Sequence, residues 1–493
     1  MLLALPILIP FATAIALKAL PYRPAVLHWV AFCGASGLLA SAIAIFLRVQ
    51  AHGIQVLQIG SWPAPFGITL VADPFSAILV LMVGIVGAAV TGNSFAGVDP
   101  RRESLGYHAL VHVLLMGVSG AFLTGDLFNL YVWFEVTLIA SFVLMALHRT
   151  RDQLHAAYVY VTMNLIASAL LLTAIGLLYG QAGTLNLADL SVSLAGSNVP
   201  LLENALAMLF LTAFGIKAGL FPLFFWLPAS YHAPPAAIGA LFAGLLTKVG
   251  VYAMIRLFTL VFRDPGAFVY PLLLTLSIAT MVVGLVGALA QTDLRRVLPF
   301  NLVGHIGFTT VGLALWTPGA LGASIFYLIH HILVITTLFL VSGLLLRQRR
   351  TTDFAALGGL YRTNPWVALL ILVPIFSLAG VPPLSGFLAK LAILIAGIET
   401  GSFVLVAVAL VVGLLTLLSM ARVWQHVVWK PGPQGAPLAP LAPLGRLALA
   451  PVVAMVVLTL GLTVGAGPVY DASTHAAELL LNPQSYVQAV LGE

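Results

Sequence analysis

The chain has 493 residues, of which 61% are hydrophobic and only 7% are charged. Soluble domains carry about 25% charged residues, so this composition excludes a soluble enzyme and indicates a polytopic membrane protein. The net charge of +6 does not indicate nucleic-acid binding, because the basic residues are spread over short segments between apolar runs rather than gathered in one patch.

The apolar runs predict an all-α polytopic membrane protein with about fourteen transmembrane helices, since each has the roughly 17–25 residues that a crossing helix needs. The expected ranges are 2–20, 26–48, 73–93, 107–123, 127–147, 155–180, 201–222, 236–260, 268–290, 297–316, 321–346, 366–398, 402–429 and 447–467. The first run has no basic segment before it, so we expect a retained helix rather than a signal peptide.

Two of these runs are interrupted by proline. The seventh reaches Pro222, and the twelfth, too long for one straight helix, contains Pro382 and Pro383. Proline removes a backbone donor and breaks a helix, and a membrane tolerates the break only where protein or water satisfies the freed groups. Five spans separate the two broken runs, which is typical of a transporter built from inverted repeats.

This symmetry divides the chain into four parts. We expect three N-terminal helices in 1–106, a first five-helix repeat (helices 4–8) in 107–262, a second repeat (helices 9–13) in 263–430, and a linker with helix 14 in 431–493. The linker is predicted from the Pro-rich stretch PGPQGAPLAPLAP, which begins at Pro431.

Lysine and arginine residues are distributed unevenly over the loops. Fourteen of them follow odd-numbered spans, whereas only Arg48 and Arg263 follow even-numbered spans. The positive-inside rule therefore predicts that the odd loops face the cytoplasm and that both termini lie on the external side.

Ionisable residues inside the spans are the main functional signal. Glu135 lies in the fifth span, about 12 Å from Leu127 at a rise of roughly 1.5 Å per residue, and an intramembrane acid is costly enough to mark a functional site. Lys217, Lys248 and Lys390 each have apolar neighbours on both sides. A lysine in hydrocarbon must pair, become hydrated or release its proton, and the last option is what a proton carrier needs.

We expect Glu135 and Lys217 to form a coupled pair, in which the carboxylate holds the lysine proton when the two are close. A lateral proton relay would continue from this pair, since histidine titrates in the physiological range. Its further members would be Lys248, His305, His330, His331 and Lys390. The alternative for each is structural, because a buried ion pair or a histidine can also simply join two helices.

The remaining charged residues near the spans receive simpler interpretations. We expect Arg256 and Arg422 to extend their guanidinium groups to the membrane interface. Asp73 stands at the start of the third span, just before Pro74, and Asp126 directly precedes the fifth span, positions where a carboxylate commonly caps a helix.

Other chemistries find no support in the sequence. There is no G-x-x-x-x-G-K-[ST] loop for a nucleotide, and a single cysteine, Cys33, does not make an iron–sulfur site. His330 and His331 do not form a metal pair, because adjacent helical residues point about 100° apart. We therefore expect no cofactor and no metal in the relay.

Four motifs resemble the proton-translocating antiporter-like subunits. They are GDLFNLYVWFEV from Gly125, FGIKAGLFPLFFWLPASYHAPP from Phe214, LLTKVGVY from Leu245 and GVPPLSGFLAK from Gly380. That superfamily includes large membrane subunits of respiratory complex I and the A and D subunits of Mrp-type multisubunit Na+/H+ antiporters. The resemblance extends over essentially the whole chain, and the first motif favours the Mrp-type D subunit.

The resemblance implies fourteen helices, inverted repeats, broken helices seven and twelve, a glutamate on helix five and lysines on helices seven, eight and twelve. These fall on Glu135, Lys217, Lys248 and Lys390. The sequence departs from the family pattern on helix eleven, where a lysine is usual and HHILVITTLF places Ile335. His331 or His305 would then have to bridge the gap through water.

The sequence therefore predicts a subunit of a multisubunit monovalent cation/proton antiporter, not an enzyme, in a bacterial inner membrane. Its expected partners are other antiporter subunits, H+, Na+ or another monovalent cation, and the lipid bilayer. The first alternative is a proton-pumping subunit of a complex I-like quinone oxidoreductase or membrane hydrogenase. A structural scaffold and a metabolite permease remain as further alternatives.

Overall fold

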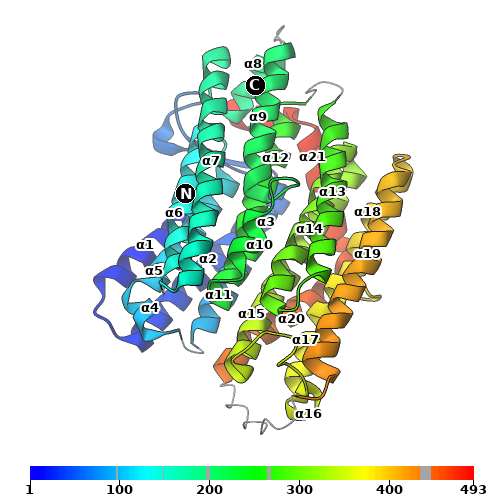
Figure 1. Ribbon diagram of the computed structural model, residues 1–493. Helices are drawn as coiled ribbons and strands as arrows, with labels where there is room; N and C mark the ends of the chain where they lie inside the picture. The colour runs from blue at the N-terminus through cyan, green and yellow to red at the C-terminus, as the bar shows by residue number, and fades with distance from the viewer. Residues whose placement is uncertain (96–97, 148, 196–199, 264–267, 433–445, 493) are drawn as a thin grey trace.

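The computed structural model describes residues 1–95, 98–147, 149–195, 200–263, 268–432 and 446–492, and most of them lie in helices that run side by side (Figure 1). The longer helices are α1 (Leu5–Ala19), α2 (Pro24–His52), α3 (Pro74–Ser94), α5 (Tyr107–Leu123), α6 (Leu127–Ala146), α7 (Arg151–Ala182), α9 (Pro200–Ala218), α12 (Thr247–Leu260), α13 (Val269–Leu289), α14 (Leu294–Leu315), α15 (Pro318–Arg349), α17 (Pro365–Ala379), α18 (Ser385–Glu399), α19 (Phe403–Trp424), α20 (Arg446–Val464) and α21 (Ala466–Leu481). The all-α membrane fold is confirmed.

Short elements join these helices. The helical ones are η1 (Leu2–Ala4), η2 (Ile59–Ser61), α4 (Pro100–Ser104), α8 (Leu187–Ala195), α10 (Trp226–Tyr231), α11 (Ala236–Leu241), α16 (Leu360–Thr363), α22 (Gln484–Leu491) and the π-helical turns η3 (Phe242–Leu246) and η4 (Gln425–Trp429). Strands β1 (Gln55–Gln58) and β2 (Thr69–Ala72) pair antiparallel, with Gln55 opposite Ala72.

In the described part of the chain, eleven helices are long and apolar enough to cross a membrane, or up to twelve if one bent pair is counted as a span. Two predicted spans fall short of that length: α5 has 17 residues, and the twelfth range is divided into α17 and α18 with 15 residues each. The count of fourteen crossings and the two repeats therefore stay predictions.

Both expected helix breaks are present. α9 ends at Ala218 and is followed by Gly219 with φ +84°, and α17 ends at Ala379 and is followed by Gly380 with the same φ. This left-handed conformation is available to glycine at little cost, so each glycine turns the chain directly after the helix. The seventh helix consequently ends before Pro222, earlier than the predicted limit of 222.

Regular structure also occurs outside the predicted spans. The segment 49–72, between the second and third predicted spans, contains the β1–β2 hairpin, and the segment 181–200, between the sixth and seventh, contains α8. The final span does not end the structure: α20 and α21 form a pair bent by 80°, and α21 packs on α15, where Gly322 lies against Thr474. The predicted linker falls largely on 433–445, outside the described residues.

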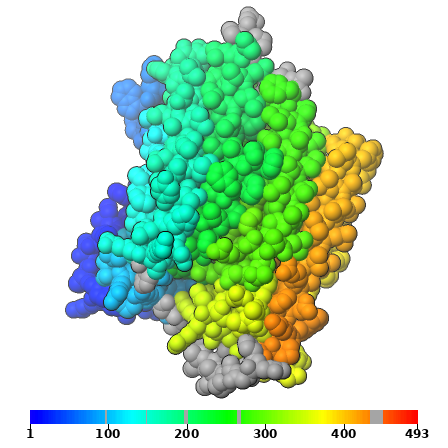
Figure 2. Space-filling view, viewed as in Figure 1, coloured from blue at the N-terminus to red at the C-terminus, as the bar shows by residue number. Residues whose placement is uncertain are grey.

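Burial separates an inner group of helices from an outer one. In the most apolar 18-residue stretches of Ala236–Leu260, α14 and α15, 94–100% of the residues are buried. In those of α1, α7, α13 and α19, only 28–39% are buried. Figure 2 shows α7 and α13 together with α19 on one face of the molecule, and the C-terminal α21 does not reach that face. A helix that is apolar all round and largely exposed suits lipid, so the inner helices form the protein-lined part of the bundle.

Candidate functional site

The predicted pair of Glu135 and Lys217 is joined through a third residue. Ser168 of α7 donates a hydrogen bond to Glu135 Oε1 on α6, and Lys217 Nζ on α9 donates to Ser168 Oγ at 3.1 Å. The described residues show no ion pair between Glu135 and Lys217 within 4.0 Å. The two charges therefore communicate through one hydroxyl group, which can both donate and accept.

Lys217 is positioned by the break at the end of α9. Its side chain is buried, and Nζ lies 4.6 Å from the centre of the Phe134 ring. Trp226, which follows the break, donates from Nε1 to the Ile216 carbonyl at 2.9 Å. α12 can approach this turn because Gly250 has no side chain: a Cβ there would lie 2.7 Å from the Ala218 amide nitrogen.

A small cavity lies beside Lys217. It has a volume of ≈ 20 Å³ and is lined by the side chains of Phe134, Asn164 and Lys217 and, on the α12 side, by Val249. A cavity of about 10–15 Å³ by this measure holds one water. One water can thus sit between the Lys217 amine and the helix that carries Lys248.

Lys248 is the most deeply buried of the three lysines, with 1% of its surface exposed. Its Nζ donates to the Ala243 carbonyl at 2.5 Å. Ala243 belongs to the π-helical turn η3 that interrupts this segment, and such turns often occur at functional sites. The carbonyl provides a polar contact for the amine but no opposite charge.

His305 and His331 stack on each other in the inner helices. Their ring centroids are 5.0 Å apart with an interplanar angle of 13°. His305 Nδ1 is 2.5 Å from the Tyr327 hydroxyl, whereas neither ring nitrogen of His331 has a hydrogen-bond partner among the described residues. Buried polar atoms are normally satisfied, so water is the expected partner of these nitrogens.

His330 and Lys390 lie at the second helix break. His330 Nδ1 is 3.0 Å from Ser385 Oγ, which is itself 3.0 Å from Ser377 Oγ. Lys390 Nζ donates to the Leu378 and Ala379 carbonyls at 3.2 and 2.8 Å. These carbonyls end α17, and the unpaired carbonyls at a helix C-terminus attract a cation.

The structure thus brings the predicted residues into three groups. Glu135 and Lys217 form one, Lys248 with the Ala243 carbonyl a second, and the histidines with Lys390 a third. No hydrogen bond joins one group directly to another in the described ranges. Ile335, at the position of the usual family lysine, is fully buried, and the neighbouring Thr336 hydroxyl has no hydrogen-bond partner among the described residues.

Sequence reasoning missed the hydroxyl groups of this site. These groups belong to Ser168, Tyr327, Ser377 and Ser385. A serine in a helix more often bonds to its own backbone. Only the contact across helices distinguishes them. No signal in one sequence identifies that contact.

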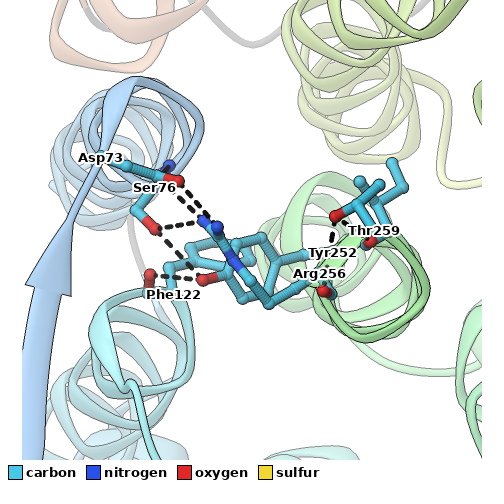
Figure 3. A network of polar contacts seen from close by, with 7 residues as sticks. Asp73, Ser76, Phe122, Tyr252, Arg256 and Thr259 are labelled. Carbon is cyan, nitrogen blue, oxygen red and sulfur yellow. Dashed lines mark hydrogen bonds and ion pairs between the residues drawn. The ribbon is translucent and has the colours of Figure 1, made fainter. Parts of the chain in front are cut away.

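The prediction for Arg256 was wrong. Its side chain is not extended but buried in protein, with 4% exposed, and its two terminal nitrogens bond Asp73 at 2.7 and 2.8 Å (Figure 3). Arg256 also donates to Ser76 Oγ, and Tyr252 donates to the Phe122 carbonyl. The Asp73 carboxylate does cap α3, accepting from the Ser76 amide at 2.8 Å, so Asp73 has two roles.

Side chains able to bind a metal ion together lie outside the predicted relay. The described residues contain one group of three side chains able to hold a metal ion, and it consists of His28, Glu103 and His108. None of these belongs to the relay. The arrangement at the predicted site can hold and pass protons through amines, imidazoles and hydroxyls.

Comparison with known proteins places these features in a family. Residues 124–416 match the family described as "NADH:quinone oxidoreductase/Mrp antiporter, TM". The D subunit of the Na(+)/H(+) antiporter of Alkalihalophilus pseudofirmus is 41% identical over 492 residues, covering 100% of this chain and 99% of that protein.

Two solved structures share the fold over its whole length. One is a chain of the Mrp complex from Dietzia sp. DQ12-45-1b, with a TM-score of 0.91, 32% identity, and coverage of 100% of this chain and 99% of that one. The other belongs to the membrane-bound sulfane sulfur reductase, an archaeal respiratory membrane complex, with a TM-score of 0.88, 25% identity and 99% coverage of both chains. The same helical scaffold thus occurs in an antiporter complex and in a redox complex.

Proposed function

The chain belongs to the NADH:quinone oxidoreductase/Mrp antiporter transmembrane family, and we propose that it is the D-type subunit of a multisubunit Na+/H+ antiporter that carries protons. The 41% identity to the D subunit of a Na+/H+ antiporter, against 25% to the respiratory complex, supports this choice. It is a subunit of a secondary transporter rather than an enzyme, and its partners are the other subunits of the complex.

The contact that carries the proposal is the chain from Lys217 through Ser168 to Glu135. With the lysine protonated, the carboxylate balances its charge across one hydroxyl. A change that draws Glu135 away weakens this electrostatic hold, because the interaction falls with distance and is strong in a medium of low dielectric constant. The lysine proton then moves on.

The next steps run through the inner helices. The cavity beside Lys217 leads toward the helix of Lys248, and His331 and His305 lie between Lys248 and the break that holds Lys390. The unsatisfied ring nitrogens of these histidines support a hydrated path, since water would complete their hydrogen bonds. At Ile335, where the family usually has a lysine, water would take the place of the missing lysine amine in this path.

The membrane orientation is part of the same proposal. By the positive-inside rule, the fourteen basic residues in the predicted odd-numbered loops support an orientation with those loops on the cytoplasmic side of a bacterial plasma membrane and the termini outside. External protons would then enter in exchange for internal Na+, driven by the proton motive force.

The test is Na+-dependent proton flux, measured by dye quenching in inverted vesicles that carry the full complex. Glu135→Gln and Lys217→Ala are compared with Asp471→Asn, which removes an exposed acid of α21. We expect flux at the background level in the first two and normal flux in the control, with equal complex assembly in all. Unchanged flux in Glu135→Gln and Lys217→Ala would contradict the relay, and lost assembly would favour the scaffold alternative.

A second candidate function follows from the respiratory neighbour. In a redox-driven pump the same residues would carry protons, but electron transfer elsewhere would supply the energy. Proton flux that is insensitive to Na+ and requires a redox substrate would favour this second function over the antiporter.

A further inference from the structure

A second ionisable cluster lies apart from the relay, where three separate elements meet. His28 comes from the first turns of α2, Glu103 from the short helix α4 and His108 from the start of α5. The basic residues Arg23, Arg101 and Arg102 lie close by in the sequence, at the end of the bundle that the proposed orientation places in the cytoplasm.

The ligand atoms converge on one carboxylate oxygen. His28 Nε2 is 2.5 Å and His108 Nε2 is 3.6 Å from Glu103 Oε1, and the three ligand atoms lie within 4.8 Å of one another. The two imidazole rings meet edge to face, with centroids 5.1 Å apart. An ion bound tetrahedrally at Zn–N distances of about 2.0–2.1 Å needs ligand atoms roughly 3.3 Å apart, so adjustments of about 1 Å suffice.

This cluster differs from an ordinary surface ion pair because it is buried. Glu103 is 5% and His108 3% exposed, and a buried carboxylate is costly without a cation. In the described ranges, the ion pairs of Glu103 are with these two histidines only. Neither ring nitrogen of His108 has a hydrogen-bond partner within those ranges, although Nε2 points at Glu103.

We propose that His28, Glu103 and His108 bind a divalent transition-metal ion of the Zn²⁺ class. Two imidazole nitrogens and one carboxylate oxygen are ligands that Zn²⁺ prefers, and three protein ligands leave a fourth position for water. The ion supplies the positive charge that Glu103 needs and a bond for His108 Nε2, which has no hydrogen bond among the described residues. It ties α2, α4 and α5 together, and it does not depend on the transport function.

The first measurement is the zinc content of the purified, tag-free complex after equilibration with buffered Zn²⁺. Wild type is compared with Glu103→Gln, His108→Gln and the control His475→Gln, which changes an exposed histidine that faces Glu478. We expect Glu103→Gln and His108→Gln each to lose about one zinc ion per chain and the control to lose none. Equal zinc content in all four proteins overturns the proposal.

A second measurement decides the matter if Glu103→Gln and His108→Gln fail to assemble. Co²⁺ is added to the wild-type complex, because tetrahedral Co²⁺ absorbs visible light strongly. A band that appears with Co²⁺, disappears with added Zn²⁺ and is accompanied by a raised unfolding temperature supports the site. The absence of such a band overturns it.

Discussion

Asp73–Arg256 and Glu135–Lys217 both pair a carboxylate with a cation between helices, but they are built differently. The first pair is in direct contact at 2.7 and 2.8 Å, both partners are buried, and the guanidinium also faces the Tyr252 ring at 5.4 Å. The second is joined only through Ser168, and Glu135 is half-buried.

The difference separates a structural ion pair from one that can pass a proton. Arginine stays protonated under all physiological conditions, and its planar group binds a carboxylate through two parallel bonds. Lysine loses its proton when its surroundings change. A direct arginine pair therefore fixes α3 to α12, whereas a lysine held through a hydroxyl can exchange its proton without breaking the fold.

The largest expected effect comes from breaking the direct pair. Arg256→Leu leaves the Asp73 carboxylate buried without an opposite charge, and we expect a loss of about 3–5 kcal/mol in the free energy of unfolding. Both assembly and transport should fall. Thermal unfolding of the solubilised complex measures this loss.

A double variant provides the control for that experiment. Asp73→Asn removes the charge but keeps the cap of α3, so Asp73→Asn combined with Arg256→Leu should recover part of the stability. A double variant no more stable than Arg256→Leu would show that the unpaired charge is not the cause.

The next variant is expected to lose transport while its assembly stays normal. Lys217→Arg keeps the positive charge but replaces a group that can release its proton with one that cannot. We expect Na+-dependent flux at the background level and normal assembly. Substantial flux in Lys217→Arg would contradict proton release from this position.

A smaller effect is expected when the connecting hydroxyl is removed. Ser168→Ala eliminates two hydrogen bonds to charged groups, each worth about 1.5–3 kcal/mol, and we expect flux to fall by about tenfold. Thr173→Ala is the matched control on α7, because the Thr173 hydroxyl bonds the Ala169 carbonyl of its own helix. If both variants transport equally, the hydroxyl bridge plays no part.

The smallest effect is expected from Arg256→Lys. The charge remains but the two-pronged contact with Asp73 is lost, which should cost about 1–2 kcal/mol and leave transport unchanged. Unfolding temperature and dye-quenching flux, measured on the same preparation, check both parts. A loss of flux at normal stability would assign Arg256 to the proton path.

The sequence by itself determined the helical membrane fold, the two broken helices and the ionisable residues worth examining. These are local properties. An apolar run long enough to cross the bilayer, a proline with its missing donor, and a lysine in hydrocarbon each carry their cost within a few neighbouring residues. Glu135, Lys217, Lys248 and Lys390 are therefore visible without any knowledge of the packing.

Only the tertiary structure decided which of these groups meet. Ser168 reaches Glu135 across 33 residues of sequence, and Arg256 reaches Asp73 across 183. Such contacts depend on how helices pack, and no local pattern distinguishes a serine that joins two charges from one that bonds its own helix. The same reason explains the wrong prediction for Arg256: a span-end arginine points to the interface unless a distant carboxylate lies beside it, and the fold places Asp73 there.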